Sequence, residues 1–303
     1  MNRIPVSVVL ITLNEEYHLP GVLDNLLGWV QEIFVVDSLS TDRTVDVALE
    51  RGAVVVQRPF GDFGDQWNWA LMKLPITTPW TLKIDPDERM SDELKKEIEK
   101  TVSATDPAEG YSFPRRLWFM GRPLHVRQDV VRLWKTGRCQ FSNVIVNEQP
   151  IINGEVRRLH GILEHLDARD LHAWCEKQNR YSTAEAVMRL RGDDLAVSPR
   201  LLGTPLERRM FLKRMFYSVP LRYQFLYWYH LLGQGVWQDG ATGRLWARLR
   251  TEVYRMCEAK VREMRQTGKI PDVPKAAHGC FDSRVLASRL QQELLPETLY
   301  RKR

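Results

Sequence analysis

Cysteine is scarce in this sequence, and no two cysteines lie close together. The four that occur are Cys139, Cys175, Cys257 and Cys280. Without a closely spaced pair, the chain offers neither a zinc-binding CxxC motif nor the framework of a disulfide-stabilised secreted domain. We therefore expect a reducing environment and a cytoplasmic protein.

Long hydrophobic runs are missing too. The most apolar part of residues 207–237 is interrupted by Arg222, Gln224 and His230, so it lacks the roughly 18 uninterrupted apolar residues of a membrane-spanning helix. The apolar run near the N-terminus leads into Asn14, Glu15 and Glu16 instead of a small-residue cleavage site. We interpret it as a first strand rather than a signal peptide.

A glycine-rich loop is also absent after this first strand. The segment ITLNEEYH, residues 11–18, contains no glycine. A dinucleotide-dependent dehydrogenase requires G-x-G-x-x-G at this position, and a sugar nucleotidyltransferase requires a glycine-rich basic loop there. The sequence disfavours both, and the nucleotidyltransferase is kept as an alternative enzyme class.

What the N-terminal part does contain is an alternation of short β-branched runs and helix-like segments. The runs lie at 6–12, 33–37, 53–57 and 80–85, and the helix-like segments at 18–28, 42–51, 64–73 and 91–101. This alternation predicts the α/β class, with a mostly parallel sheet flanked by helices on both faces. Later strand-like segments predict a mixed or antiparallel extension of the sheet. From about residue 171 the chain becomes helical, with a hinge or loop at 198–205.

Polar residues gather where three of the predicted strands end. These clusters lie at 12–16, 37–44 and 85–88. Ligands of open α/β sheets bind beside the carboxyl ends of the strands, and right-handed crossovers bring those ends to one edge. We therefore expect the three clusters to share one site.

The cluster at 85–88 places Asp85 and Asp87 one residue apart at a strand end. Two such carboxylates repel each other when unpaired, and Mg²⁺ or Mn²⁺ bound together with substrate phosphate would remove the repulsion. The alternative is a polar turn in which Asp87 or Ser91 caps the next helix. Because Ser91 alone is sufficient as a cap, we favour a metal and phosphate site for the two aspartates.

The other two clusters also contain acidic residues. Asp37 ends its strand and would accept the N3–H of a pyrimidine base, since Thr41 and Asp42 are available to begin the following helix. Glu15 would accept a ribose hydroxyl or initiate a helix. For Glu15 both interpretations stay open.

Five motifs together resemble the inverting family 2 glycosyltransferases of the GT-A fold. They are ITLNEE, VVDSLSTDRT, GDQWNWAL, LKIDPDERMSDEL and IVNEQ, in this order. The chain is most similar to lipopolysaccharide-core β-glucosyltransferases and their polysaccharide-assembly relatives, strongly over roughly the first 170 residues and more loosely in the segment beginning SVPLRYQ. The resemblance implies a nucleotide-sugar-binding catalytic domain at 1–170 and a helical C-terminal region at 171–303.

The resemblance also implies roles for individual residues. The donor-binding positions are Thr12, Asn14, Glu15, Asp37, Asn68 and Asp85. Asp87 would bind the divalent metal, and Glu148 would be the general base on the acceptor hydroxyl, although a solvated strand-end carboxylate is the ordinary fate of such a glutamate. His165 would reach the metal or the diphosphate, with a structural histidine as the alternative. Arg115 and Arg116 are candidates for contacts with an anionic acceptor or the donor phosphates, with surface arginines as the alternative.

Two positions depart from the family pattern. Trp67 stands where relatives usually have a basic residue, which removes a cationic phosphate contact from that helix, and Asn147 stands where many have a histidine. These departures motivate a non-enzyme alternative, a membrane-docked assembly factor that keeps the nucleotide-sugar fold without turnover.

The positive charge of the chain is concentrated in one late segment. Residues 199–270 hold 14 Lys and Arg against 5 Asp and Glu, a net charge of +9, whereas the whole chain carries +6 and the remainder therefore −3. Cations interleaved with aromatic residues suit the surface of an anionic membrane. The alternative is packing on the catalytic domain or on another subunit. No nucleic-acid-binding motif is present, and we expect no nucleic acid as a partner.

Together with the motifs, the resemblance implies transfer of a sugar, expected to be glucose, from a UDP-sugar to a lipid-linked or lipopolysaccharide-type glycan. The expected location is peripheral, on the inner face of the cell membrane. The expected cofactor is Mg²⁺ or Mn²⁺.

Overall fold

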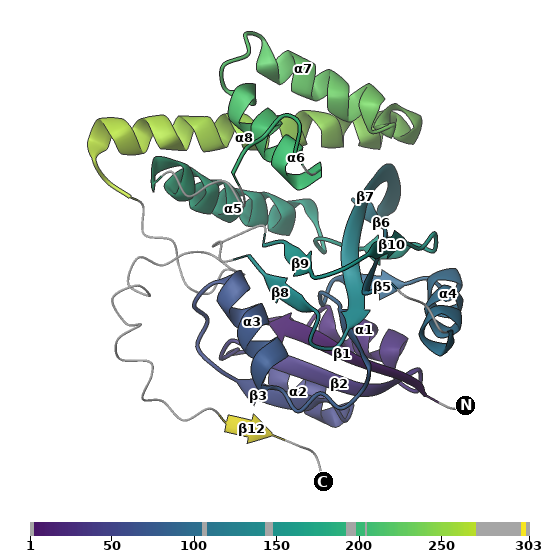
Figure 1. Ribbon diagram of the computed structural model, residues 1–303. Helices are drawn as coiled ribbons and strands as arrows, with labels where there is room; N and C mark the ends of the chain where they lie inside the picture. The colour runs from purple at the N-terminus through teal and green to yellow at the C-terminus, as the bar shows by residue number, and fades with distance from the viewer. Residues whose placement is uncertain are drawn as a thin grey trace.

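A computed structural model (Figure 1) describes residues 3–104, 108–142, 148–191, 198–203, 205–270 and 298–300. The sheet is centred on four parallel strands, β1 (Ile4–Thr12), β2 (Val30–Asp37), β3 (Val54–Gln57) and β4 (Trp80–Lys83), in the order β3-β2-β1-β4. The intervening helices are α1 (Leu19–Leu26), α2 (Thr44–Glu50) and α3 (Phe63–Lys73), and α4 (Asp92–Ser103) follows the last strand. The predicted α/β class is confirmed.

Both faces of this parallel part are buried, as its continuous apolar strands predict. Successive side chains of a strand point to opposite faces. Val8 and Leu10 therefore pack in the core that contains α1, whereas Val9, between them, packs with Trp67 of α3. The near-continuous apolar composition of β1 thus follows from its two covered faces.

Side-chain caps define the starts of two helices. The Asp62 carboxylate accepts a hydrogen bond from the backbone N–H of Asp65 at 2.7 Å at the start of α3. The Ser91 hydroxyl accepts from the backbone N–H of Leu94 at 3.2 Å at the start of α4. The prediction that Ser91 caps this helix is confirmed.

The second half of the sheet is mixed, which confirms the predicted extension. Beyond β4 the order continues with β7 (Arg122–Lys135), β6 (Gly110–Phe119), β11 (Leu163–His165) and β5 (Glu88–Met90), and β10 (Val156–Arg158) also pairs with β6. β4 and β7 are antiparallel, as are β7 and β6, while β11 runs parallel to β6. β8 (Cys139–Phe141) and β9 (Pro150–Ile152) form a separate pair, and β12 (Thr298–Tyr300) pairs with β3. Of the strand-like segment at 143–148, residues 143–147 lie outside the described part of the chain.

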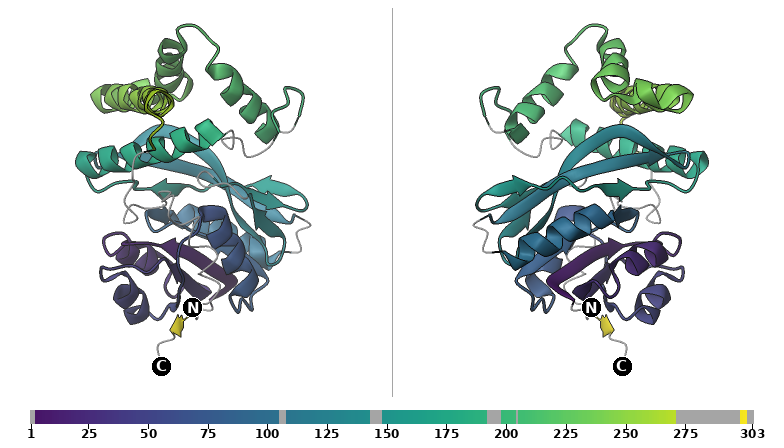
Figure 2. Two further views of the ribbon diagram at one scale, coloured as in Figure 1. Left: turned by 90° about the vertical axis from the view of Figure 1, so that its left-hand side faces the viewer. Right: turned by 90° about the vertical axis from the view of Figure 1, so that its right-hand side faces the viewer.

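A helical layer covers one end of the sheet. It consists of α5 (Leu171–Arg191), α6 (Pro205–Phe216), α7 (Arg222–Trp228), the π-helical turn η1 (Tyr229–Gly233), the 3₁₀ turn η2 (Val236–Asp239) and α8 (Gly240–Thr267). Figures 1 and 2 show α5 next to the sheet and α7 on the far side of the layer. The β6–β7 hairpin packs into this layer, because Phe119 and Val126 share a hydrophobic cluster with Trp174 and Trp246. Within the described residues, none of the helices has the length and apolar content needed to span a bilayer.

Candidate functional site

The carboxyl ends of β1 and β2 are tied together around a buried aspartate. Thr12 lies opposite Asp37 in the parallel register, and its hydroxyl donates to Asp37 Oδ1 at 2.9 Å. Asp37 Oδ2 accepts from the backbone N–H of Ser40 at 2.8 Å and from Gln57 Nε2 at 2.9 Å. The Asp37 carboxylate is completely buried and shapes the loop that follows β2. A pyrimidine base would have to replace one of these donors, so the base contact stays a prediction.

Asn14 joins this loop to the loop after β1. Its backbone adopts a φ of +55°, in the left-handed region that asparagine tolerates better than most residues. The backbone N–H of Asn14 donates to Ser40 Oγ at 2.8 Å, and its side-chain oxygen accepts from the backbone N–H of Thr41 at 2.8 Å. Asn14 therefore positions the two loops, and its contact with a donor stays a prediction.

Glu15 contributes to the start of α1. Its carbonyl oxygen accepts hydrogen bonds from the backbone N–H groups of His18 and Leu19, and its carboxylate contacts His18 Nδ1 at 2.8 Å. This arrangement supports the helix-initiating interpretation without testing the ribose contact. At the next helix, Asp42 Oδ1 accepts from the backbone N–H of Thr44, the first residue of α2, at 3.0 Å.

Asn68 and Trp67 hold β8 against α3. The Asn68 amide exchanges two hydrogen bonds with the backbone of Phe141, at 3.0 and 2.8 Å. The Trp67 ring stacks on the Phe141 ring with centroids 5.4 Å apart, and Lys83 Nζ lies 4.3 Å from the Trp67 centroid. The missing basic residue at position 67 is thus replaced by an aromatic face that supports a cation from β4.

Lys83 connects two of the residues that the sequence singles out. Its Nζ lies 2.6 Å from Glu148 Oε1 and 3.9 Å from Asp85 Oδ1. The Lys83 side chain is 5% exposed and that of Glu148 is 13% exposed. The ordinary expectation of a solvated carboxylate at Glu148 is therefore wrong. The candidate base is paired and largely buried beside Asp85.

Asp85 and Asp87 lie in a turn and face different partners. β4 ends at Lys83 rather than at residue 85 as predicted. Asp85 Oδ2 accepts from Arg132 Nη2 at 2.6 Å, whereas Asp87 Oδ2 lies 3.2 Å from His165 Nε2 and 3.3 Å from Lys177 Nζ. The protein's own cations therefore offset the predicted repulsion, and a shared metal ion is not required for it. Burial raises the pKa of Asp85, but Arg132 and Lys83 outweigh burial and lower it to about 2.

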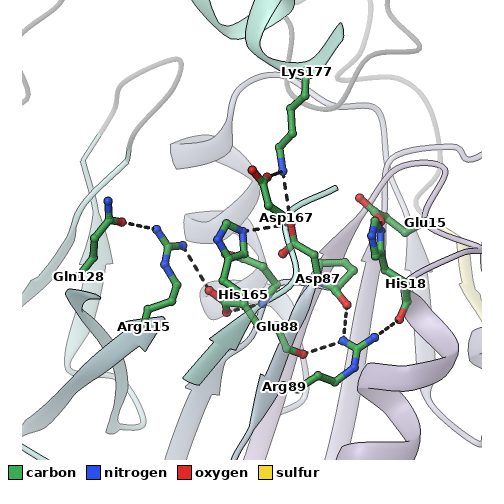
Figure 3. A network of polar contacts seen from close by, with 12 residues as sticks. Glu15, His18, Asp87, Glu88, Arg89, Arg115, Gln128, His165, Asp167 and Lys177 are labelled. Carbon is green, nitrogen blue, oxygen red and sulfur yellow. Dashed lines mark hydrogen bonds and ion pairs between the residues drawn. The ribbon is translucent and has the colours of Figure 1, made fainter. Parts of the chain in front are cut away.

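A second acidic group completes a possible metal site (Figure 3). Asp87, His165 and Asp167 each direct one ligand atom to a common place, and these atoms lie within 4.8 Å of one another. Burial opposes ionisation of both aspartates, but His165 and Lys177 hold the pKa of Asp87 well below its usual range, and the same two groups lower the pKa of Asp167. Two carboxylates and an imidazole are a donor set that suits Mn²⁺ and can accept Mg²⁺. The donor set therefore fits a divalent cation.

Sequence reasoning missed two residues of this group. Asp167 follows His165 by one intervening residue, and this second pair of potential ligands at i and i+2 was the available signal. Lys177 lies on α5, and its Nζ contacts Asp167 Oδ1 at 2.8 Å. Nothing in the local sequence of that helix distinguishes Lys177 from an ordinary surface lysine.

Arg115 and Arg116 are neighbours on β6 and so point to opposite faces of the sheet. Arg115 contacts Glu88 Oε1 at 3.3 Å, and Glu88 is completely buried. Arg116 forms a two-pronged ion pair with Glu164, with Nε 2.9 Å from Oε2. Neither is an ordinary surface arginine. Because each already has a carboxylate partner, a contact with phosphate or acceptor would require an exchange of partners and stays a prediction.

Comparison with known families identifies the N-terminal part of the chain. Residues 7–141 match the model named Glycosyl transferase family 2. The matched range contains the donor-side residues and Asp87. Glu148, His165, Asp167 and Lys177 lie beyond it.

Two curated relatives carry related names. An uncharacterized glycosyltransferase of Rickettsia typhi is 28% identical over 199 residues, which cover 60% of this chain and 66% of the relative, so the match spans slightly less than two thirds of that protein. The lipopolysaccharide core biosynthesis glycosyltransferase LpsC of Rhizobium meliloti is 26% identical over 285 residues, covering 90% of this chain and 98% of the relative.

The fold is similar to a solved structure. The mannosyltransferase PcManGT from Pyrobaculum calidifontis, in complex with GDP-Man and Mn²⁺, superimposes with a TM-score of 0.50 at 14% identity and covers 89% of both chains. At this level of identity the similarity concerns the fold alone, and it includes the helical layer as well as the sheet.

Proposed function

Because residues 7–141 form a glycosyl transferase family 2 domain, we propose that the chain is a metal-dependent, inverting glycosyltransferase. Its donor is a UDP-sugar, with glucose as the sugar, and its acceptor is a lipid-linked or lipopolysaccharide-type glycan. The observation that carries this proposal is the position of Glu148. This candidate base shares the ammonium group of Lys83 with Asp85, and Asp87 of the candidate metal site follows Asp85 by two residues.

The donor lies along the carboxyl edge of the parallel strands in this proposal. Thr12, Asn14 and Asp37 hold the nucleoside at the ends of β1 and β2. Asp87, His165 and Asp167 hold the divalent cation, which, when bound, neutralises the charge that develops on the leaving diphosphate. Nucleotide choice is testable, because a guanine base offers a different hydrogen-bonding edge to Asp37 than a uracil base does.

Glu148 takes the proton of the acceptor hydroxyl. An inverting transfer needs the acceptor oxygen to attack opposite the leaving diphosphate, and a positioned base contributes about 10² to 10⁴ in rate to such a step. Glu148 Oε1 is bound to Lys83, so we assign the proton to Oε2. Lys83 fixes the orientation of the carboxylate, and the Lys83 ammonium group lies over the aromatic rings of Trp67 and Phe141.

One observation supports the acceptor class. The relative named for lipopolysaccharide core biosynthesis aligns with nearly the whole chain. Arg115 and Arg116 remain our candidates for contacts with anionic groups of acceptor or donor.

Membrane association is supported by an exposed apolar stripe on α7 and η1. We use this name for Leu221, Phe225, Trp228, Tyr229 and Leu232, whose exposed fractions lie between 53% and 65%. Their spacing places them on one side of the helix, while His230 and Leu231 on the other side are buried. Among the described residues, the catalytic domain leaves these five side chains more than half exposed. A lipid surface would cover them, and a second subunit is the alternative.

A line of arginines on the neighbouring helix favours an anionic lipid surface. Arg244, Arg248, Arg255 and Arg262 of α8 are all exposed, and their spacing of four and seven residues places them along one side of the helix. α8 packs beside α7, where Arg255 lies 4.9 Å from the ring of Tyr223. Each cation near an anionic leaflet adds about 1 kcal/mol of binding free energy. We therefore place the protein on the inner face of the cell membrane.

The proposed activity is tested with purified protein, UDP-glucose, Mn²⁺ and a lipopolysaccharide core acceptor. Glu148→Gln is expected to abolish transfer while leaving Mn²⁺-dependent UDP binding intact, because only the base is removed. Glu176→Gln, on an exposed side of α5, is the matched control and should transfer at the wild-type rate. Full activity of Glu148→Gln would show that another group is the base.

The same experiment separates the alternatives. Loss of UDP binding in Glu148→Gln would show that Glu148 is structural. A wild-type protein that binds UDP with Mn²⁺ but transfers no sugar to any glycan of a panel would favour the assembly-factor alternative. Thermal shifts with UDP-, GDP- and ADP-sugars, with and without Mn²⁺, identify the donor.

Flotation with anionic liposomes tests the membrane proposal. Replacing Phe225 and Trp228 by serine should lower the bound fraction severalfold, because each aromatic side chain contributes roughly 1 kcal/mol when partly buried in the interface. Replacing Met72, which is 74% exposed on α3, by serine is the control. Unchanged flotation of the double variant together with a loss of dimers in solution would assign the stripe to a second subunit.

A further inference from the structure

A cation from the helical layer already lies between the two carboxylates of the candidate metal site. Lys177 Nζ is 2.8 Å from Asp167 Oδ1 and 3.3 Å from Asp87 Oδ2, and the Lys177 side chain is 19% exposed. Figure 3 shows the side chain reaching from α5 directly to Asp167 and Asp87. The ammonium group therefore contacts two of the three groups that could bind a metal ion.

An ammonium group and a divalent cation are alternatives at such a place. Mg²⁺ binds carboxylate oxygens at about 2.0 to 2.1 Å, and Lys177 contacts one oxygen of each of the two carboxylates that would bind it here, Asp87 Oδ2 and Asp167 Oδ1. The single charge of the ammonium group and the two charges of the metal ion would repel each other strongly within a few ångströms, because the site is largely shielded from water. Without any cation, in contrast, the two aspartates would be left as a repelling buried pair.

The helix that carries Lys177 is fixed in place. Trp174, one turn earlier on α5, is 5% exposed and packs edge to face on Phe119 of β6, with ring centroids 5.7 Å apart. Lysine has a flexible four-carbon stem. Exchange of the ammonium group for a metal ion therefore requires rotation of the side chain and leaves α5 where it is.

We propose that Lys177 is the internal counter-ion of the metal site, which occupies the place of the divalent cation in the metal-free protein and must leave Asp87 and Asp167 before that cation binds. The inference rests on the proposed metal dependence, and it adds a residue outside the family 2 domain that sets the affinity for the metal. Lys177 keeps the acidic site assembled between turnovers at the expense of weaker metal binding.

Mn²⁺ binding without nucleotide, followed by the electron paramagnetic resonance signal of free Mn²⁺, tests this inference. Lys177→Met should bind Mn²⁺ more tightly, by about tenfold, a size typical of the coupling between two binding events. Asp167→Asn should bind it more weakly by a similar factor. Lys100→Met, at an exposed position of α4, is the control and should match the wild type.

Stability provides a second measurement. The metal-free Lys177→Met protein should melt at a lower temperature than the wild type, and Mn²⁺ should raise its melting temperature more than it raises that of the wild type. Lys177→Gln keeps the length and polarity of the side chain, and it replaces Lys177→Met in both measurements should the methionine variant fail to fold.

The outcomes distinguish this inference from the proposed function. Unchanged or weaker Mn²⁺ binding in the Lys177 variants, beside measurable binding in the wild type, would overturn the counter-ion role and leave the transferase proposal untouched. Absence of Mn²⁺ binding in every variant, with or without UDP, would overturn the metal dependence itself.

Discussion

The aspartates in two parts of the same sheet edge have different kinds of partner. At the ends of β1 and β2, the Asp37 carboxylate accepts hydrogen bonds from neutral groups of Thr12, Ser40 and Gln57. Beyond β4, Asp85 and Asp87 contact basic side chains: Arg132 for the first, and His165 and Lys177 for the second. The neutral part fixes the shape of two loops. The charged part holds basic groups that a metal ion and a diphosphate can displace or contact.

The largest expected effect follows from removing charge at the second part. Asp87→Asn should lower transfer by at least about 10² to 10³, the range seen when one group that stabilises developing charge is lost. Its free energy of unfolding should fall as well, because the ionised Asp87 carboxylate contacts His165 and Lys177 in the folded protein. Steady-state kinetics and urea unfolding check this. Wild-type turnover would show that Asp87 does not act on the donor.

Removing the carboxylate of the first part should mainly lower the stability of the protein. Asp37→Ala leaves buried donors of Thr12, Ser40 and Gln57 without their acceptor, and unsatisfied buried groups cost about 1 to 3 kcal/mol each. We expect the free energy of unfolding to fall by roughly 2 to 3 kcal/mol after partial rearrangement. Urea unfolding measures it. A stable Asp37→Ala protein that has lost only UDP binding would show that Asp37 acts on the ligand rather than on the stability of the fold.

Acid should weaken the charged part in a defined window. The pKa of Asp85 is lowered from 3.8 to about 2, so its contribution to stability is fully present above pH 3.8 and is lost as the pH falls through 2. Partial exposure reduces this contribution to about 1 to 2 kcal/mol. In Asp85→Asn, the decrease in the free energy of unfolding from pH 5 to pH 2 should be smaller by this amount. Parallel curves for the two proteins would contradict the ion pair with Arg132.

The smallest effect is expected from a single hydroxyl of the neutral part. Thr12→Val removes one hydrogen bond to Asp37 and should lower the free energy of unfolding by about 1 kcal/mol. UDP affinity should fall with it if Thr12 and Asp37 hold the nucleoside. Isothermal titration with UDP and Mn²⁺ measures that affinity. A change in stability at constant affinity would restrict Thr12 to a structural role.

Local pattern was sufficient for much of the fold and for part of the site. The strand β1 and the cap at Ser91 follow from neighbours in sequence, because burial on both faces selects apolar β-branched residues and a helix start requires an acceptor. The same reasoning placed Asp85 and Asp87 at the end of β4, and the structure ends that strand two residues earlier, at Lys83. The reasoning was also wrong about their surroundings, because it contained no information on which cations the later strands and α5 bring to them.

Local sequence patterns were sufficient to predict an α/β fold with acidic residues near a strand end, because side-chain periodicity and the order of the motifs are local properties. Tertiary packing, in contrast, pairs Glu148 with Lys83, 65 residues away, and brings Lys177 to Asp87, 90 residues away. Such contacts depend on the way the start of β9, next to Glu148, and the helix α5 pack over the edge of the sheet. The balance of charge at the site is therefore a consequence of packing. It cannot be predicted from any single segment of the sequence.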